Sequence, residues 1–125
     1  MISFEEFILD DDSPIYVQII RYVKQGIAAG RIGDQEEVPS RRALSALLGV
    51  NPNTIQKAYH MLEEEGIIVS RSGAKSFTRV DEITVERIRW ELTVSSTLQW
   101  VKTLKQLGVG RKEASALFEK LWEER

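Results

Sequence analysis

The segment from Gly49 to Gly66 carries the side chains whose types and spacing best fit a chemical role. Four polar residues in it recur at i, i+3, i+4 and i+7, which places them on one face of a helix: Asn53, Gln56, Lys57 and His60. Amide and ammonium groups at such positions hydrogen-bond to base edges in the major groove of DNA. Asn51 and Thr54 lie at the start, where free backbone N–H groups of a helix bind phosphate. The same pattern also describes a solvated, well-capped helix face, so both interpretations stay open.

Two further groups of cations flank this segment. Arg41 and Arg42 follow a serine cap at the start of a preceding helix, where cations oppose the helix dipole unless an external anion binds there. Downstream, a turn that contains Gly73 carries three basic side chains, Arg71, Lys75 and Arg79. Each group by itself is equally a set of exposed surface charges. A common role depends on the order of the elements that carry them.

Charge is unevenly distributed along the chain. The net charge is −2, from 17 basic and 19 acidic residues, which taken alone argues against a nucleic-acid partner. Residues 38–80, however, hold six basic and three acidic side chains, a local charge of +3 that leaves −5 for the remainder. Because salt screens charges beyond roughly 8 Å, a phosphate backbone responds to this local excess.

The composition gives little support to catalysis or metal binding. With no cysteine in the chain, disulfides, thiolate metal ligands and cysteine nucleophiles are excluded. The single histidine, His60, has no second histidine or cysteine with which to hold a metal or activate a nucleophile. Glu63–Glu65 is interpreted as a charged run that keeps the far end of its helix away from DNA. We therefore expect no enzyme activity, no catalytic residue, no metal and no cofactor.

Caps and periodicity predict the first elements that position these side chains. Ser13 caps a helix that begins at Pro14 and carries apolar residues at a 3.6-residue period until Gly30 ends it. Residues 31–38 show no clear period and are expected to form a loop. Pro39-Ser40 then opens a short second helix.

A third helix and a hairpin complete this part of the chain. Asn51-Pro52 opens the helix, Gly66 ends it, and its inward positions are Ile55, Tyr59 and Leu62. Residues 67–70 and 76–80 flank the basic turn and are expected to pair as a β-hairpin. Three helices followed by a hairpin is the order of a winged helix-turn-helix, which joins the three polar groups in one motif.

Residues 81–125 are expected to form two amphipathic helices. The first runs for about 25 residues to Leu107, and Gly108-Val109-Gly110 separates it from the second. Neither helix can bury its apolar face alone, so the pair must pack on each other, on the preceding domain or on a second chain. The main apolar positions, which include two of the three tryptophans, are Trp90, Val94, Leu98, Val101, Leu104, Leu117, Phe118, Leu121 and Trp122.

Four stretches resemble the signature of the GntR family of bacterial transcription regulators. They are residues 14–19 (PIYVQI), 38–44 (VPSRRAL), 49–59 (GVNPNTIQKAY) and 62–66 (LEEEG). The short two-helix tail resembles that of the YtrA subfamily, whose members lack the large effector-binding domain of other GntR proteins and dimerise through the tail. The resemblance therefore implies that the apolar tail positions are dimer contacts.

The same resemblance implies which residues bind DNA. Arg42 corresponds to the arginine that contacts DNA from the second helix, and Ser72 and Gly73 correspond to the tip of the wing in the minor groove. The positions of the recognition helix are Asn51, Pro52, Asn53, Thr54 and Gln56. We add four cations from the charge pattern, Arg41, Lys57, Arg71 and Lys75. The chain departs from the family at Asp34-Gln35, where the family has Pro-Gly, and at Gly73-Ala74-Lys75, where it has Gly-x-Gly.

The expected fold is mainly α with a small β-hairpin. Residues 1–80 form a winged helix-turn-helix with an acidic segment at 1–12, and residues 81–125 form a dimerisation tail. With no signal-peptide pattern and no apolar run approaching the ~18 residues of a membrane span, we expect a soluble, cytoplasmic protein without a membrane partner.

The expected function is sequence-specific regulation of transcription. A homodimeric repressor would bind a palindromic operator in double-stranded DNA, and the resemblance implies its own operon and a neighbouring ABC transporter as targets. The alternative is a winged-helix module that binds protein or RNA without operator specificity, which the salt dependence of binding distinguishes. The sequence identifies no small-molecule effector.

Overall fold

The computed structural model describes residues 1–71 and 75–124. Contacts within the chain divide it into two units, Met1–Arg89 and Trp90–Arg125. The first unit holds all three strands and four helices in whole or in part, and the second holds the rest of the long helix and the last helix. The expected Ser72 and Gly73 contacts lie outside the described residues.

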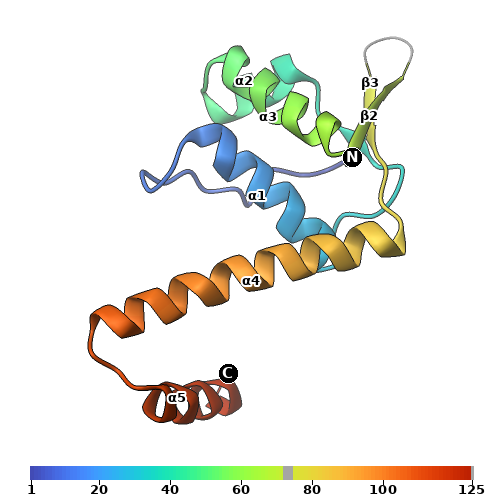
Figure 1. Cartoon of the computed structure of the whole chain (residues 1–125). Coiled ribbons are helices and arrows are strands. Elements are labelled where there is room, and N and C mark those ends of the chain that lie inside the picture. The colour runs from blue at the N-terminus through green and yellow to red at the C-terminus, as the bar shows by residue number, and fades with distance from the viewer. Residues whose placement is uncertain (72–74, 125) are drawn as a thin grey trace. The chain divides into compact units, whose positions relative to one another are not determined.

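Three helices form the centre of the first unit. They are α1 (Ile15–Ala28), α2 (Arg41–Leu48) and α3 (Pro52–Glu64), and α3 packs on both of the others (Figure 1). The predicted inward residues of α3 are fully buried, together with apolar side chains from the neighbouring elements: Ile19, Val23, Ile27, Leu44, Ile55, Tyr59, Leu62 and Ile67. This core fixes which face of α3 points to solvent.

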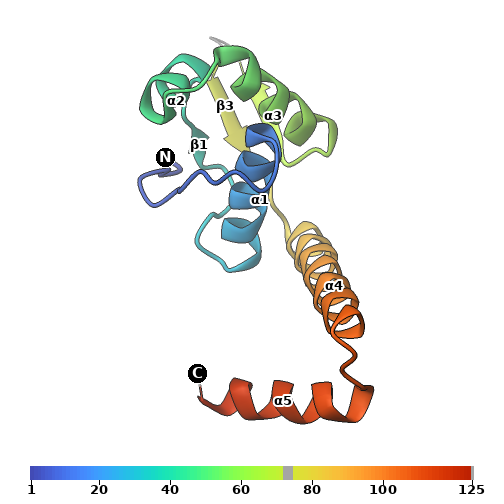
Figure 2. The same ribbon diagram turned by 90° about the vertical axis from the view of Figure 1, so that its left-hand side faces the viewer.

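A three-stranded antiparallel sheet lies beside the helices, in the order β1-β3-β2. The predicted hairpin is confirmed as β2 (Ile68–Arg71) and β3 (Lys75–Thr78), with Arg71 opposite Lys75. Figure 2 shows the third strand, β1 (Glu37–Val38), beside β3. The expectation of a loop throughout residues 31–38 is therefore wrong at its end. A strand of two residues is too short to show a period of two, so only its pairing with β3 reveals it.

The start of α1 also differs from the prediction. Ser13 does not cap the helix, because the N-cap position is Pro14 and no side chain bonds to the first turn. The Ser13 hydroxyl has no hydrogen-bond partner, while its carbonyl accepts from Gln18 Nε2 at 2.7 Å. Gln18 is buried and also bonds both backbone groups of Asp10. Gln18 thus holds the acidic segment against α1, a role that the helix-cap pattern does not predict.

α1 ends in a close contact with the loop that follows it. Gly30 has φ 80°, and the carbonyl of Gly26 accepts from the N–H groups of Arg31 and Ile32. A Cβ at Gly26 would lie 2.5 Å from Cδ1 and 2.8 Å from Cγ1 of the buried Ile32 side chain. Glycine at position 26 therefore allows the chain to turn back tightly towards β1.

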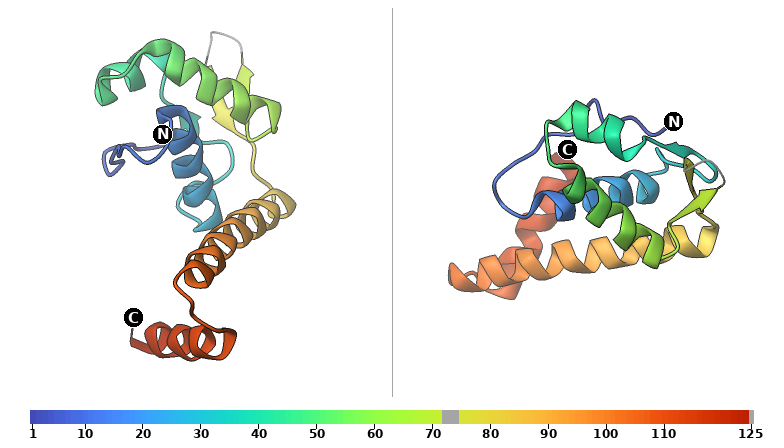
Figure 3. Two further views of the ribbon diagram at one scale, coloured as in Figure 1. Left: turned by 60° about the vertical axis from the view of Figure 1, so that its left-hand side comes forward. Right: turned by 90° about the horizontal axis from the view of Figure 1, so that it is seen from above.

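α4 (Glu82–Gln106) is the expected helix of 25 residues and is continuous in both views of Figure 3. Asp81 caps it by accepting from the Thr84 N–H at 2.7 Å, and Ile88 is fully buried in the first unit. From Trp90 to Glu124, through α5 (Arg111–Glu124), no residue is buried. No helix among the described residues is long and apolar enough to cross a membrane.

Candidate nucleic-acid interface

The two arginines at the start of α2 have different surroundings. Ser40 caps the helix by accepting from the Ala43 N–H, as predicted. Arg41 turns towards α3, where its Nη2 donates to Glu63 Oε1 at 2.9 Å and its guanidinium carbon lies 5.2 Å from the centre of the Tyr59 ring. Its buried Nε has no hydrogen-bond partner. Arg41 therefore links α2 to α3 and is only partly accessible to an external phosphate.

The Arg42 side chain is exposed and makes no ion pair or hydrogen bond to another residue in the described part of the chain. It lies in the first turn of α2, where the helix dipole disfavours a cation and favours an anion. An anion beside Arg42 would be favoured by both the side chain and the helix terminus. This is the geometry expected of a residue that meets a phosphate or a base edge.

The turn between α2 and α3 is rigid. Gly49 has φ 68°, a left-handed conformation that glycine adopts without strain, and the Ser45 hydroxyl donates to the Val50 carbonyl. Asn51 caps α3 by accepting from the Asn53 N–H at 2.8 Å. Asn51 is thus a structural cap as well as an expected DNA contact, because its cap uses only the side-chain oxygen.

The outer face of α3 is polar and exposed. Four of the expected contacts on α3 are exposed to solvent: Pro52, Asn53, Gln56 and Lys57. His60 is exposed as well, while Thr54 is half-buried. The buried residues of α3, Ile55, Ala58, Tyr59 and Leu62, hold the opposite face on the core. The Lys57 ammonium lies 4.0 Å from the centre of the Tyr16 ring on α1.

Buried Tyr59 also connects α3 to the start of α2. Its hydroxyl donates to the Pro39 carbonyl at 2.8 Å, and burial raises the pKa of Tyr59 far above that of a free phenol. The hydroxyl therefore stays protonated and keeps this bond at any physiological pH. The loop that carries Pro39 leads directly into the two arginines of α2.

The acidic end of α3 anchors the helix. Glu65 forms an ion pair with Lys24 of α1 at 3.0 Å, and only 8% of the lysine side chain is exposed. Glu63 forms an ion pair with Arg41. Glu64 lies 3.5 Å from His60 Nε2 on the same helix. Two of these three carboxylates are thus paired with cations of other helices. Their main structural effect is to fix α3 on α1 and α2, which an acidic run in the sequence alone does not indicate.

The three basic residues predicted around the wing, Arg71, Lys75 and Arg79, are all exposed, and the side chains of the first two differ in their contacts. Arg71 Nη2 donates to Gln35 Oε1, and the guanidinium lies 4.7 Å from the centre of the Phe77 ring. Gln35, at one of the two positions where the GntR pattern has Pro-Gly, has φ 59°, in the left-handed region. The Lys75 side chain has no ion pair or hydrogen bond within the described residues.

No cluster of three or more acidic or histidine side chains suited to a metal occurs in the described ranges. The site is instead a set of donors: Arg42, the outer face of α3 and the wing lysine. Such donors bind phosphate oxygens and base edges.

Comparison with known proteins supports the same conclusion. Residues 15–77 match the model described as bacterial regulatory proteins, gntR family. The chain belongs to the GntR family. It is 33% identical over 111 residues to the transcriptional repressor YtrA of Bacillus subtilis, which covers 89% of this chain and 81% of that protein. The resemblance to YtrA is therefore confirmed, and the chain is a DNA-binding transcriptional regulator rather than an enzyme.

Solved GntR structures share the fold. A GntR family regulator from Listeria monocytogenes is 31% identical, with a TM-score of 0.79 over 90% of this chain and 98% of that chain. YtrA from Sulfolobus acidocaldarius is 25% identical, with a TM-score of 0.54 over 93% and 94% of the two chains. The winged helix-turn-helix with a two-helix tail is thus the fold of this GntR protein.

Proposed function

We propose that this GntR regulator is a homodimeric repressor that inserts α3 of each subunit into the major groove of a palindromic operator. The observation that carries this proposal is that α2 and α3, which pack on each other, expose an unpaired Arg42 side chain and a polar helix face. The proposed contacts are Arg42, Asn51, Pro52, Asn53, Thr54, Gln56, Lys57, Arg71, Ser72, Gly73 and Lys75. Arg41 supports them by holding α2 on α3 through Glu63.

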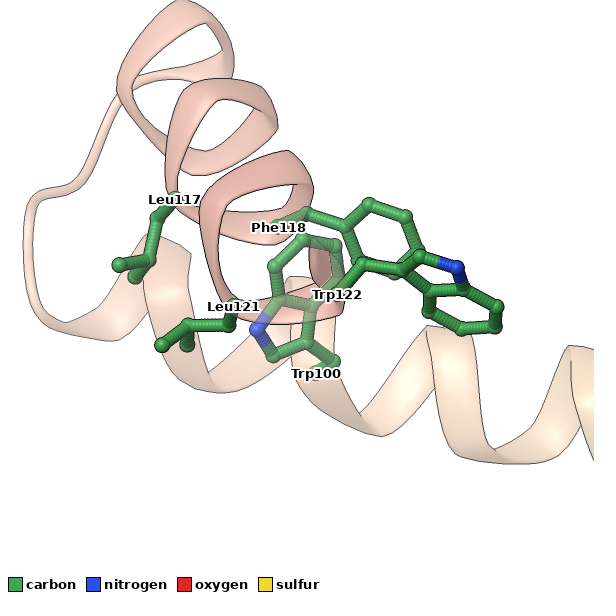
Figure 4. A pocket seen from close by; sticks show the side chains of 5 residues that line it. All are labelled: Trp100, Leu117, Phe118, Leu121 and Trp122. Atoms are coloured by element: carbon green, nitrogen blue, oxygen red, sulfur yellow. The ribbon is translucent and has the colours of Figure 1, made fainter. Parts of the chain in front are cut away.

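The tail supports dimerisation. α5 has no buried residue, although Leu117, Phe118, Leu121 and Trp122 are all apolar. Figure 4 shows the last three beside Trp100 of α4, with Phe118 centred 5.6 Å from each tryptophan ring. Full burial of one such side chain contributes about 1.5–3 kcal/mol, so covering this surface with a second copy stabilises both chains. Trp90, Val94, Leu98, Val101 and Leu104 continue the proposed contact along α4.

The two-fold symmetry of the proposed dimer implies a palindromic operator. Two winged helices related by a two-fold axis bind two half-sites that are inverted repeats, separated by whole turns of DNA. Residues 1–80 are the proposed DNA-binding domain and residues 81–125 the proposed dimerisation region. The first turns of α4 still pack in the first unit through Ile88, so the same helix joins the two functions.

The proposed direction of control is repression. YtrA of Bacillus subtilis, which is similar over most of both chains, is named a repressor. A protein bound over a promoter excludes polymerase, which requires only that the dimer binds its operator. The chain's own operon and a neighbouring ABC transporter are the proposed targets, as the YtrA resemblance implies.

Fluorescence anisotropy tests the proposal with the duplex upstream of the chain's own gene and a scrambled duplex of the same composition. We expect a preference of ~10³ or more for the native duplex at physiological salt. The logarithm of affinity should fall linearly with the logarithm of salt, at about 0.9 per phosphate contacted. Equal affinity for both duplexes would contradict autoregulation, and a flat salt dependence would favour a protein-binding module.

A further inference from the structure

Tyr16 lies next to α3, a contact that the sequence pattern does not predict. It is the second residue of α1 and half-buried, and its ring lies against the Lys57 ammonium of α3, 4.0 Å from Nζ to the ring centre. Lys57 shares its helix face with Asn53, four residues earlier, and stands next to Gln56. The Tyr16 ring is thus at the edge of the face proposed to enter the major groove.

The hydroxyl of Tyr16 differs from the other two tyrosine hydroxyls. Tyr22 donates to the Ser3 carbonyl and Tyr59 donates to the Pro39 carbonyl, each at 2.8 Å. The Tyr16 hydroxyl makes no hydrogen bond to another described residue, and it is not a buried orphan. It is therefore a solvent-accessible donor held in place by its ring.

Lys57 is a second accessible donor at the same place. It forms no ion pair with a carboxylate in the described part of the chain. An ammonium has three N–H donors, and contact with an aromatic face leaves others free for an anion. The ring attracts the cation and restricts a side chain that would otherwise lose much of its rotamer entropy on binding.

We propose that Tyr16 and Lys57 together bind one backbone phosphate of the operator, at the edge of the groove that α3 enters. The phenol donates a neutral hydrogen bond, and the ammonium supplies the charge and a second hydrogen bond to the same phosphodiester. The ligand is a phosphodiester rather than a base, because lysine and tyrosine side chains both donate to phosphate oxygens and the Tyr16 ring holds Lys57 at the edge of the α3 face. This pair, Tyr16 and Lys57, is called the clamp. Its assignment rests on the proposed function, and it extends the proposed DNA-binding face from α3 to α1.

The two halves of the clamp make different predictions. Tyr16→Phe keeps the ring beside Lys57 and removes only the hydroxyl, so affinity should fall about tenfold for native and scrambled duplexes alike. Its salt slope should stay unchanged, because a neutral donor releases no counterion. Lys57→Met should lower affinity and also make the salt slope shallower by about 0.9. Tyr16→Leu should reduce both the affinity and the salt slope, since Lys57 then loses its contact with the aromatic ring.

Ethylation interference shows whether one phosphate is involved. Ethylation of a contacted phosphate weakens binding of the unaltered protein but not of a variant that has lost the contact. Because the other side chain of the pair still contacts the phosphate, Tyr16→Phe and Lys57→Met should each become less sensitive to ethylation at the same phosphate in each half-site, and the double variant should become insensitive there. Tyr22→Phe and Lys112→Met, a tyrosine outside the proposed face and an exposed lysine of α5, are the matched controls and should keep the full interference pattern.

The outcomes separate this proposal from the one on which it rests. If the unaltered chain binds neither duplex, the proposed function fails before any variant is compared. If it binds its operator and both variants keep full interference at every phosphate, the clamp is wrong and the operator assignment stands. Reduced interference at two different phosphates in the two variants would also overturn the proposed shared contact. Circular dichroism melting of each variant shows that any loss of affinity is not a loss of folding.

Discussion

Replacing Arg41 and Arg42 by alanine, one at a time, separates folding from DNA binding on α2. Arg41 pairs with Glu63 at 2.9 Å, with 31% of each side chain exposed, a geometry that contributes about 0.5–1 kcal/mol. Its guanidinium also lies over the Tyr59 ring, which adds about 0.5–1 kcal/mol. Arg41→Ala should therefore lower the free energy of unfolding by about 1–2 kcal/mol.

Arg42→Ala should lower operator affinity and leave the free energy of unfolding nearly unchanged. Its exposed side chain touches no partner in the described residues, so the free energy of unfolding should change by less than about 0.5 kcal/mol. Operator affinity should fall by ~1–3 kcal/mol if the guanidinium contacts a guanine, or by less, with a salt slope shallower by about 0.9, if it contacts a phosphate.

Urea unfolding followed by circular dichroism measures the first quantity, and fluorescence anisotropy with the operator measures the second. Glu63→Ala serves as a control, because it should reproduce the stability loss of Arg41→Ala, and the double variant should lose less than the sum. A large affinity loss in Arg41→Ala with unchanged stability, or equal stability losses in both arginine variants, would refute the division of roles.

Three other substitutions test the fold and the tail. Gly26→Ala should lower the free energy of unfolding by about 1 kcal/mol, because overpacking against Ile32 costs about 2 and the gain in helix propensity returns about 1. Asp81→Ala should destabilise the protein at neutral pH but not in acid. The backbone hydrogen bond from α4 lowers the Asp81 pKa, so its contribution is complete above the unfolded value of 3.8 and is lost as pH falls through the folded value. Phe118→Asp should weaken the dimer about 1000-fold, since the two-fold axis places two charges in the contact.

Each of these has a control and a contradicting result. Gly33→Ala, where an added Cβ meets no atom within 4 Å, should be neutral in urea unfolding, and an equal loss there would remove the packing explanation. For Asp81, urea midpoints of both proteins measured from pH 7 downwards give the comparison, and a difference that does not shrink below pH 3.8 would contradict the cap. Lys120→Asp on α5 should leave the sedimentation profile unchanged, whereas an undisturbed dimer in Phe118→Asp would exclude the tail contact.

The recognition helix could be predicted from the sequence because its signals are local. The Asn51-Pro52 start, the inward Ile55 and Leu62 and the glycine that follows at position 66 all act within one helix, and the structure confirms them. Local patterns also predicted the hairpin and the length of α4. The prediction was wrong at Ser13, because Pro14 is the N-cap and the Ser13 carbonyl accepts a hydrogen bond from Gln18.

Contacts between distant segments could not be predicted. The adjacent Arg41 and Arg42 are the same residue type, and only the packing of α2 on α3 brings one of them to Glu63. The same is true of the pair formed by buried Lys24 and Glu65, which are 41 positions apart. Tyr16 belongs to a stretch that resembles the GntR signature, yet its neighbour Lys57 became evident only when α1 and α3 were packed together.

Hydroxyl-radical footprinting of the complex with the upstream duplex tests the central claim most directly. A dimer that inserts one α3 into each half-site predicts two protected segments of equal strength, related by two-fold symmetry and about 10 base pairs, or a multiple of this, apart from centre to centre. Arg42→Ala should weaken both segments together. A single protected segment, or protection spread evenly along the duplex, would contradict a homodimer on a palindromic operator.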